Sequence, residues 1–297
     1  MRVLVVPDVH GSTYWKRVLE IDDSTYDHVV FLGDYFDSYN NKWPSQGENF
    51  QEICDFVRKD TQRRHMLLGN HDHSYISSQS NCSGHQYDQA TTIRNLLVNN
   101  YDIIDLAFEC DDWVFSHAGF SKTSVKVAED VMNRPFSIKN LNEYWHSLTP
   151  EEYSKFEHLL NWFGMFDPSG DEPTQFCLWI RPSSLLQDAF FPKQVVGHTE
   201  ISFGEPIVLS KKENTVVLMD NRLHTLYDVF DTQQERKSMG ILEMNKYLKN
   251  LTQAINDLKS KKIEDQTKII QELEKDFSKD VAEFCYPAFF KGRFDVS

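Results

Sequence analysis

The sequence lacks several features that mark common classes of protein. Its five cysteines are scattered and form no CxxC pair, which argues against a disulfide framework or a thiolate zinc site. No apolar run reaches about 18 residues, the length expected of a membrane span. A Gly-rich phosphate loop with lysine and a G-x-S-x-G elbow are both missing, so kinase and serine-hydrolase chemistry have no supporting motif.

Basic residues are also scarce relative to acidic ones. There are 31 lysines and arginines against 45 aspartates and glutamates, which gives a formal net charge of -14. This charge argues against a nucleic-acid partner held by counterion release. Phosphate substrates stay compatible with it, because bound divalent cations make a pocket locally positive. Since the first strand begins close to Met1, with no room for a signal peptide, we expect a cytoplasmic protein with no membrane association.

What the sequence does contain is a set of short β-rich runs that each lead into a residue able to bind a metal. The runs at 3–6, 29–32, 66–68, 113–115 and 195–196 are followed by three imidazoles, two carboxylates and one amide. The six residues are Asp8, His10, Asp34, Asn70, His117 and His198. In an open α/β sheet, ligands gather beyond the carboxyl ends of the strands, so these side chains are expected to converge. Mixed nitrogen and oxygen donors favour Mn²⁺, Fe or Zn²⁺ in a catalytic site.

Strand and helix patterns alternate along the chain as far as about residue 100, with helices expected over 14–19, 48–58 and 89–99. The polar stretch 73–87 is expected to form a mobile loop at the rim of the site or an inert surface loop. Between 120 and 176 the pattern becomes helical and aromatic, with a capping box at Thr149 and Glu152 and a candidate C-cap at Gly164. We predict a helical cap over the site whose aromatic residues form its own core, with a base-stacking platform as the alternative.

The remaining runs complete the expected fold. Those at 206–209, 216–219 and 224–227 predict a second, antiparallel sheet, which gives an α/β fold with a two-sheet β-sandwich flanked by helices. We expect a catalytic domain over 1–234, with the cap inserted at 120–176, and a helical C-terminal extension over 235–297. Apolar residues in the extension recur at steps of three and four. Packing on the catalytic domain and homo-oligomer formation both fit this spacing.

Five motifs stand in the order found in the calcineurin-like metallophosphoesterases. They are Asp8-Val9-His10, Gly33-Asp34-Tyr35-Phe36-Asp37, Gly69-Asn70-His71-Asp72, Ser116-His117-Ala118-Gly119 and Gly197-His198-Thr199. The segment Trp179-Ile180-Arg181 resembles the phosphoprotein phosphatase branch, in particular its bacterial serine/threonine phosphatases and diadenosine tetraphosphatases. The resemblance covers about residues 1–227 and implies the metallophosphoesterase fold.

The resemblance also implies a dinuclear metal centre. It places Asp8, His10 and a bridging Asp34 on the first ion, and Asp34, Asn70, His117 and His198 on the second. Manganese is the first choice for the pair, with iron or zinc as alternatives. Two cations about 3.5–4 Å apart can clamp the oxygens of an in-line displacement and activate a water molecule.

The same resemblance assigns roles to three further residues. It makes His71 the general acid that protonates the leaving group and Asp37 the carboxylate that orients it. Arg181, together with Asn70, is expected to bind the substrate phosphate, and the planar guanidinium suits that task. Single residues of these types are often helix caps, packed histidines or structural ion pairs, so the assignment depends on all five motifs together.

Two departures from the branch bear on the substrate. The phosphatases usually continue the second motif as Asp-Arg-Gly, whereas Asp37 is followed here by Ser38 and Tyr39, and the third motif ends in Asp72 where glutamate is common. We predict a phosphatase that hydrolyses phosphate monoesters of proteins or small molecules. Alternatives are a dinucleoside polyphosphate hydrolase, a phosphodiesterase or nuclease, and a binding scaffold without turnover.

Overall fold

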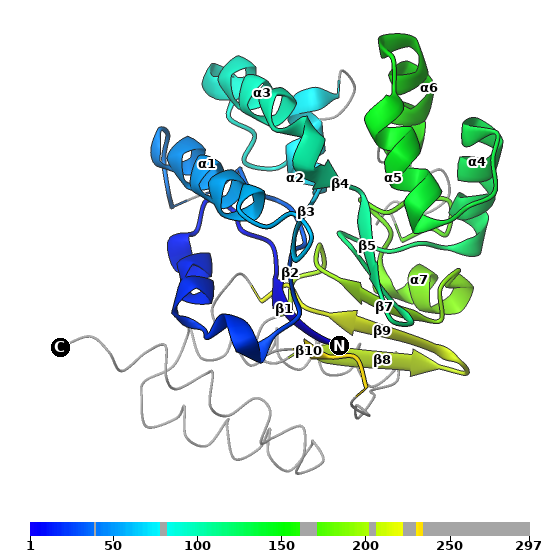
Figure 1. The fold of residues 1–297 in the computed structure, drawn as a ribbon. Helices are drawn as coiled ribbons and strands as arrows, with labels where there is room; N and C mark the ends of the chain where they lie inside the picture. The colour runs from blue at the N-terminus through cyan, green and yellow to red at the C-terminus, as the bar shows by residue number, and fades with distance from the viewer. Residues whose placement is uncertain (39, 78–81, 161–170, 202–205, 222–229, 234–297) are drawn as a thin grey trace, which may run out of the picture.

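Two five-stranded β-sheets form the centre of the structure, a computed structural model that describes residues 1–38, 40–77, 82–160, 171–201, 206–221 and 230–233 (Figure 1). The first sheet has the order β10-β1-β2-β3-β4. Its four parallel strands are β1 (Arg2–Val6), β2 (His28–Phe31), β3 (Arg64–Leu67) and β4 (Ile104–Asp105). The antiparallel edge strand β10 (Phe230–Asp231) pairs with β1.

The second sheet has the order β5-β6-β7-β9-β8 and is mixed. Its parallel centre consists of β6 (Trp113–Ser116), β7 (Lys193–Val196) and β9 (Asn214–Leu218). The antiparallel edges are β5 (Ala107–Cys110) and β8 (Ile207–Lys211). The prediction of two sheets flanked by helices is confirmed, but the expected antiparallel character of the second sheet is wrong at its centre. The predicted strand at 224–227 lies outside the described residues.

Side chains that alternate in direction along the strands of the first sheet contribute to two hydrophobic clusters. Val3 and Val5 of β1 point into the cluster shared with the second sheet, whereas Leu4 and Val6 point into the cluster shared with the helices. All four side chains are fully buried. Because side chains of a strand point to opposite faces in turn, a near-continuous apolar run is required where both faces are covered. This explains why β1 is apolar at every position from Val3 to Val6.

Helices α1 (Ser45–Arg58) and α3 (Ala90–Asn99) lie on the same side of the first sheet in Figure 1. Their buried residues, such as Phe50 and Ile93, belong to the cluster that contains Leu4 and Val6. The helices predicted over 48–58 and 89–99 are therefore confirmed. The segment predicted over 14–19 is instead a 3-10 helix, Thr13–Glu20, which begins where the Ser12 hydroxyl accepts a hydrogen bond from the Tyr14 amide at 3.2 Å.

The polar stretch expected to be a loop begins as a helix. Helix α2 (Asn70–Ile76) takes in its first four residues, and His73 is only 1% exposed. Residues 78–81 lie outside the described part, and the chain continues at Cys82. The composition of this stretch suggested solvent exposure, but contacts with the cap bury its beginning.

The cap consists of α4 (Lys122–Met132), α5 (Ile138–Ser147) and α6 (Pro150–Leu160). The predicted capping box is confirmed, since the Thr149 hydroxyl accepts from the Glu152 amide at 3.3 Å and the Glu152 carboxylate accepts from the Thr149 amide at 3.0 Å. Tyr144 and Trp145 are buried, as expected for a cap core. Residues 161–170, which include Trp162, Phe163, Phe166 and Gly164, lie outside the described residues.

The cap is fastened to α2, the helix that carries the third motif. On α6, the Tyr153 hydroxyl hydrogen-bonds His73 Nε2 at 3.0 Å. Further along, the Ser77 hydroxyl donates to the Glu157 carboxylate at 2.6 Å. Helix α7 (Pro182–Asp188) packs on the second sheet near β8 and β9. The cap thereby contacts an element of the candidate site rather than only the outer surface.

The described chain ends close to where it begins. The Met1 amino group donates to the Thr232 hydroxyl at 2.7 Å, next to the pairing of β10 with β1. The predicted helical extension over 235–297 lies outside the described residues. Within the described part, none of the helices combines the length and apolar character that crossing a bilayer requires.

A pair of histidines lies at the amino ends of β2 and β3, away from the strand ends that carry the motifs. His28 Nδ1 and His65 Nε2 are 3.2 Å apart, and the His65 ring stacks on Phe108 with a centroid distance of 3.8 Å. Burial, together with the neighbouring His28, lowers the pKa of His65 to about 4. The folded protein therefore disfavours protonated His65 relative to the unfolded chain.

This shift predicts a pH dependence of stability. Because the folded pKa lies below the unfolded value of about 6.5, the free energy of unfolding should fall as pH drops from about 6.5 to about 4, by at most about 3 kcal/mol from this residue. Urea unfolding at several pH values measures it. His65→Phe keeps a stacking ring and His65→Gln does not, yet both should flatten the pH slope to the same extent. A slope unchanged in both variants would contradict the assignment.

Candidate active site

The six predicted ligands converge where the strands of both sheets end. Asp8 follows β1, Asp34 follows β2 and Asn70 follows β3, while His117 and His198 follow β6 and β7 of the second sheet. Ligand atoms of Asp8, Asp34 and His117 all lie within 4.8 Å of one another. The atoms of a second group, His10, Asp34 and His71, satisfy the same limit. Asp34 belongs to both groups.

Two glycines allow the loops to close around the carboxylates. A Cβ on Gly69 would lie 2.1 Å from Asp34 Oδ1, and a Cβ on Gly197 would lie 2.2 Å from Asp8 Oδ1. Neither distance is compatible with a real side chain. The glycines of the third and fifth motifs are thus required by the approach of backbone to carboxylate.

Backbone conformation also turns the ligands inward. His10, Asp34, Asp37 and His198 all have positive φ, between 42° and 65°. Such left-handed conformations cost non-glycine residues about 1 kcal/mol or more each and tend to cluster at functional sites. Four of them within one site show that the loops are shaped for the position of their side chains.

Three histidines share one hydrogen-bonding pattern. His10 Nδ1 contacts the Phe36 carbonyl at 2.8 Å and His117 Nδ1 the Leu32 carbonyl at 2.9 Å. His198 Nε2 contacts the Trp179 carbonyl at 3.2 Å. A carbonyl oxygen only accepts, so each of these ring nitrogens must donate. In a neutral ring the other nitrogen then carries a lone pair, which is the orientation found in metal-ligating histidines.

The free ring nitrogens of His117 and His198 meet at Asn70. His117 Nε2 lies 2.7 Å and His198 Nδ1 3.1 Å from Asn70 Oδ1. Burial lowers the pKa of both histidines, so their rings are neutral and both contacts bring acceptor atoms together. Acceptors that converge in this way fit a shared cation. The donor set of this structure therefore matches a divalent metal site.

The electrostatics of the buried carboxylates also indicate a metal site. Asp8 and Asp34 are 2% and 1% exposed. Burial raises the pKa of Asp8, and the nearby charges of Asp220 and Asp34 raise it further. The His198 amide donates to the Asp8 carboxylate at 3.1 and 3.2 Å, which partly offsets these effects. Buried carboxylates so close together favour a cation between them.

His71 differs from the other three histidines. Its Nδ1 contacts the carboxylate of Asp37, at 2.8 Å from Oδ2, instead of a backbone carbonyl. Its Nε2 faces the ligand cluster, 4.0 Å from Asp34 Oδ2. Burial lowers the pKa of His71, but the charges of Asp34 and Asp37 outweigh burial and raise it to about 9. The pairing of Nδ1 with a carboxylate directs Nε2 at the cluster, which fits the predicted proton donor.

Arg181 hydrogen-bonds to the loop of the fifth motif. Its Nη1 donates to the His198 carbonyl at 3.0 Å and to the Thr199 hydroxyl at 3.2 Å. Burial lowers its pKa, and the nearby carboxylates of Asp8 and Asp171 oppose that shift. Arg181 therefore lies close to the ligand cluster and supports the His198 loop through one nitrogen of its guanidinium group.

A sequence model of the calcineurin-like phosphoesterases matches residues 1–219, which include every motif of this cluster. The chain belongs to the calcineurin-like phosphoesterase family. This confirms the family and the metallophosphoesterase fold that the motifs predicted. A search among curated proteins gives no match.

Several solved structures are similar to this phosphoesterase. A cold-active protein-tyrosine phosphatase of a psychrophilic Shewanella shares 21% identity over 74% of this chain and 70% of that chain, with a TM-score of 0.48. A protein serine/threonine phosphatase from Saccharomyces cerevisiae shares 13% over 74% and 67%, with a TM-score of 0.40. A metallophosphoesterase from Sphaerobacter thermophilus shares 17% over 73% and 75%, with a TM-score of 0.35.

The structure adds two acidic residues to which the sequence reading gave no role. Asp72, fully buried, accepts from the Tyr35 amide at 2.8 Å and the Gly69 amide at 3.0 Å, and so joins the second motif to the third. Asp220 follows β9 and raises the pKa of Asp8. The signal for Asp220 was present, because it follows an apolar strand as Asp8 and Asp34 do.

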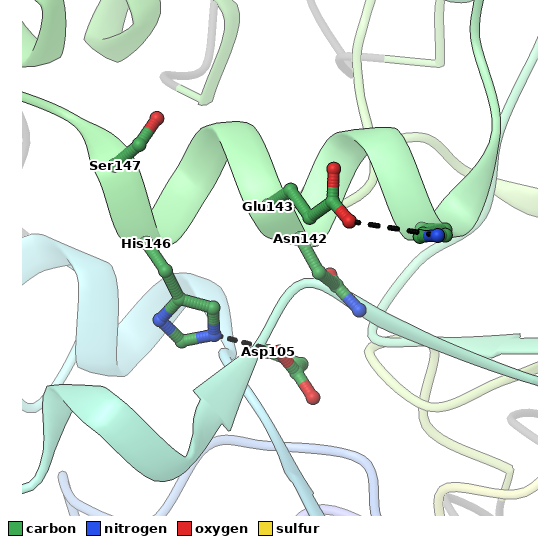
Figure 2. A pocket seen from close by; sticks show the side chains of 6 residues that line it. Asp105, Asn142, Glu143, His146 and Ser147 are labelled. Atoms are coloured by element: carbon green, nitrogen blue, oxygen red, sulfur yellow. Dashed lines mark hydrogen bonds and ion pairs between the residues drawn. The ribbon is translucent and has the colours of Figure 1, made fainter.

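A cavity of about 590 Å³ lies elsewhere, along α5 (Figure 2). It is lined by Asp105, Lys139, Asn142, Glu143, His146 and Ser147. Figure 2 shows His146 paired with Asp105, at 2.8 Å. None of its lining residues belongs to the motifs, so the phosphoesterase site is assigned to the strand ends.

The close approach of Gly69 to Asp34 predicts the effect of one methyl group. Gly69→Ala should destabilise the protein by about 1–3 kcal/mol, a usual cost of overpacking, and should weaken Mn²⁺ binding because Asp34 must move. Gly47→Ala is the matched control, since its Cβ would lie 2.5 Å from the Trp43 ring. Urea unfolding and calorimetric Mn²⁺ titration measure both effects. Equal Mn²⁺ affinity in the two variants would contradict the assignment of Asp34.

Proposed function

We propose that this phosphoesterase hydrolyses phosphate monoesters with the help of two divalent cations that share Asp34. The observation that carries the proposal is the common orientation of three histidines. Each of them donates one ring N–H to a backbone carbonyl. The other nitrogen lies within 4 Å of Asp34 in His10 and His117, and 3.1 Å from Asn70 Oδ1 in His198. Histidines that serve only for packing have no need of this repeated arrangement, and the presence of Asp34 in both groups of candidate ligands supports two ions rather than one.

The ligands divide into two sets that meet at Asp34. Asp8 and His10 would complete one set, and Asn70, His117 and His198 the other. The nitrogen and oxygen donors suit manganese, with iron or zinc as alternatives. The chemistry that such a metal pair supplies when bound is Lewis acidity toward the phosphoryl group and a lowered pKa of bound water.

The proton donor in this proposal is His71. Its Nε2 faces the cluster, while Asp37 holds Nδ1 at 2.8 Å and fixes the plane of the ring. A protonated imidazole in this position can give its proton to a leaving alkoxide as the phosphate ester breaks. The requirement is greatest for alkyl esters, because their leaving groups are strong bases.

Arg181 would bind the substrate phosphate through the guanidinium nitrogens other than Nη1. Nη1 already supports the His198 loop. A planar guanidinium offers paired donors that match phosphate geometry. Asn70 would support the same task, since its amide group lies among the ligands, with Oδ1 2.7 Å from His117 Nε2. The absence of an arginine after Asp37 leaves Arg181 with a larger share of phosphate binding than in the phosphoprotein phosphatases.

Phosphorylated proteins or small molecules are the substrates we propose, within a catalytic domain over 1–234. Hydrolysis of dinucleoside polyphosphates or phosphodiesters would use the same metal set, so the choice depends on the substrate assay. A binding scaffold without turnover is disfavoured because all six predicted ligands are present and lie together, Asn70 and His198 through their contacts with each other and with His117.

The full chain loaded with Mn²⁺ should hydrolyse an aryl phosphate monoester, and chelation should abolish the reaction. Asp34→Asn should lower kcat/KM at least about 100-fold, because the shared ligand is lost. Asp55→Asn, on the exposed face of α1, is the matched control and should leave the rate unchanged. The assay compares an aryl monoester, an alkyl monoester, a phosphopeptide, a diester and diadenosine tetraphosphate.

The outcomes of that assay distinguish the candidate functions. Preference for a monoester supports the proposal, and preference for the diester or diadenosine tetraphosphate replaces it with the corresponding hydrolase. If the Mn²⁺-loaded protein turns over none of the five substrates faster than Asp34→Asn does, the result favours a binding scaffold over an enzyme.

A further inference from the structure

The carboxylate of Asp37 contacts a second buried side chain besides His71. Tyr75 lies one turn after His71 on α2 and is 5% exposed. Its hydroxyl donates a hydrogen bond to Asp37 Oδ1, while Asp37 Oδ2 contacts His71 Nδ1 at 2.8 Å. The two oxygens of one carboxylate therefore connect two residues of the same helix, and Asp37 itself is 1% exposed.

The Tyr75 hydroxyl is held from its other side as well. The Gln86 amide donates to it at 2.9 Å, and a phenol has a single proton to give. With its oxygen accepting from Gln86, that proton is directed at Asp37. The hydroxyl thus has one defined orientation.

The ring of Tyr75 is fixed by two aromatic neighbours. His85 stacks on it with a centroid distance of 4.2 Å and an interplanar angle of 18°. Phe36 meets it edge-on at 6.0 Å. Phe36 is also the residue whose carbonyl contacts His10. The ring is therefore held by the second motif on one side and by the segment after α2 on the other.

Asp37 depends on this support. It has a positive φ of 65°, in a loop rather than in a helix or strand. A buried carboxylate oxygen that loses its donor is costly, and the carboxylate is free to rotate about its side-chain bonds unless both oxygens are engaged. The Tyr75 hydroxyl engages the oxygen that does not face His71.

We propose that Tyr75 is a positioning residue for the His71–Asp37 pair. Its hydroxyl fixes the rotation of the Asp37 carboxylate, so that Oδ2 is aimed at His71 Nδ1 and His71 Nε2 is aimed at the ligand cluster. This inference rests on the proposed role of His71 as proton donor. It differs from a purely packing role of Tyr75, in which the ring would matter and the hydroxyl would not.

The test is Tyr75→Phe in the full, Mn²⁺-loaded chain, because phenylalanine keeps the ring and removes the hydroxyl. For an alkyl phosphate, kcat should fall about tenfold with KM unchanged, within the usual contribution of general acid catalysis. For nitrophenyl phosphate, whose leaving group needs little protonation, kcat should change less than about twofold. Equal losses on both substrates would overturn the proposal.

A double-mutant cycle with His71→Asn identifies the route of the effect. If Tyr75 acts through His71, Tyr75→Phe should have no further effect on alkyl phosphate hydrolysis once His71 is replaced. Additive losses would overturn the proposal. The matched control is Tyr101→Phe, which removes a hydroxyl that donates to the Trp145 carbonyl at 2.7 Å, and neither residue belongs to a motif. It should leave both substrates unaffected.

A measurement on the metal-free protein keeps this inference separate from the proposed function. The His71 Nδ1–H proton, hydrogen-bonded to Asp37, should give a downfield ring N–H signal in the proton NMR spectrum, assigned by its loss in His71→Asn. Tyr75→Phe should shift or broaden that signal, and Tyr101→Phe should not. An unchanged signal in Tyr75→Phe overturns the positioning role, whereas absence of turnover in the unmodified chain counts against the proposed function alone.

Discussion

Burial of the Asp34 carboxylate among imidazoles is the interaction on which the rest of the site depends. Asp34 Oδ1 lies 3.6 Å from His117 Nε2, and Oδ2 lies 3.7 Å from His10 Nε2 and 4.0 Å from His71 Nε2. The His71 amide donates to Oδ1 at 2.9 Å, so the third motif is built around this carboxylate. One side chain thereby links the second motif to residues of three others, the first, third and fourth, and loss of its charge would affect all of them.

The backbone around Asp34 shows how the fold supports this arrangement. The Asp34 carbonyl accepts from the His10 amide at 2.6 Å and the Val9 amide at 3.1 Å, which extends the pairing of β1 and β2 into the two loops. Asp72 performs the same task between the second and third motifs. Because the strands are buried on both faces, the loops begin from fixed positions, and the left-handed residues can be held there.

The candidate ligands and their convergence could be predicted from the sequence, because each ligand follows an apolar run and the strand ends of an α/β fold meet at one edge. The parallel centre of the second sheet could not, since the pairing of β6, β7 and β9 joins segments far apart in sequence. For the same reason Asp220 was not predicted as part of the site, because the strand before it was assigned to a separate antiparallel sheet. The helical start of the stretch after Asn70 was missed because its polar residues are buried by contacts with the cap, such as that of His73 with Tyr153. The link from Tyr75 to Asp37 depends on a loop conformation that no local pattern specifies.

The central claim is that Asp34 is shared by two cations. Calorimetric titration with Mn²⁺, combined with electron paramagnetic resonance of the loaded protein, tests it most directly. We expect two ions per chain with a spin-coupled signal, and loss of the coupling in Asp34→Asn, because the bridging carboxylate is removed. A single ion per chain, or two ions whose signals are independent and unaffected by Asp34→Asn, would contradict the account.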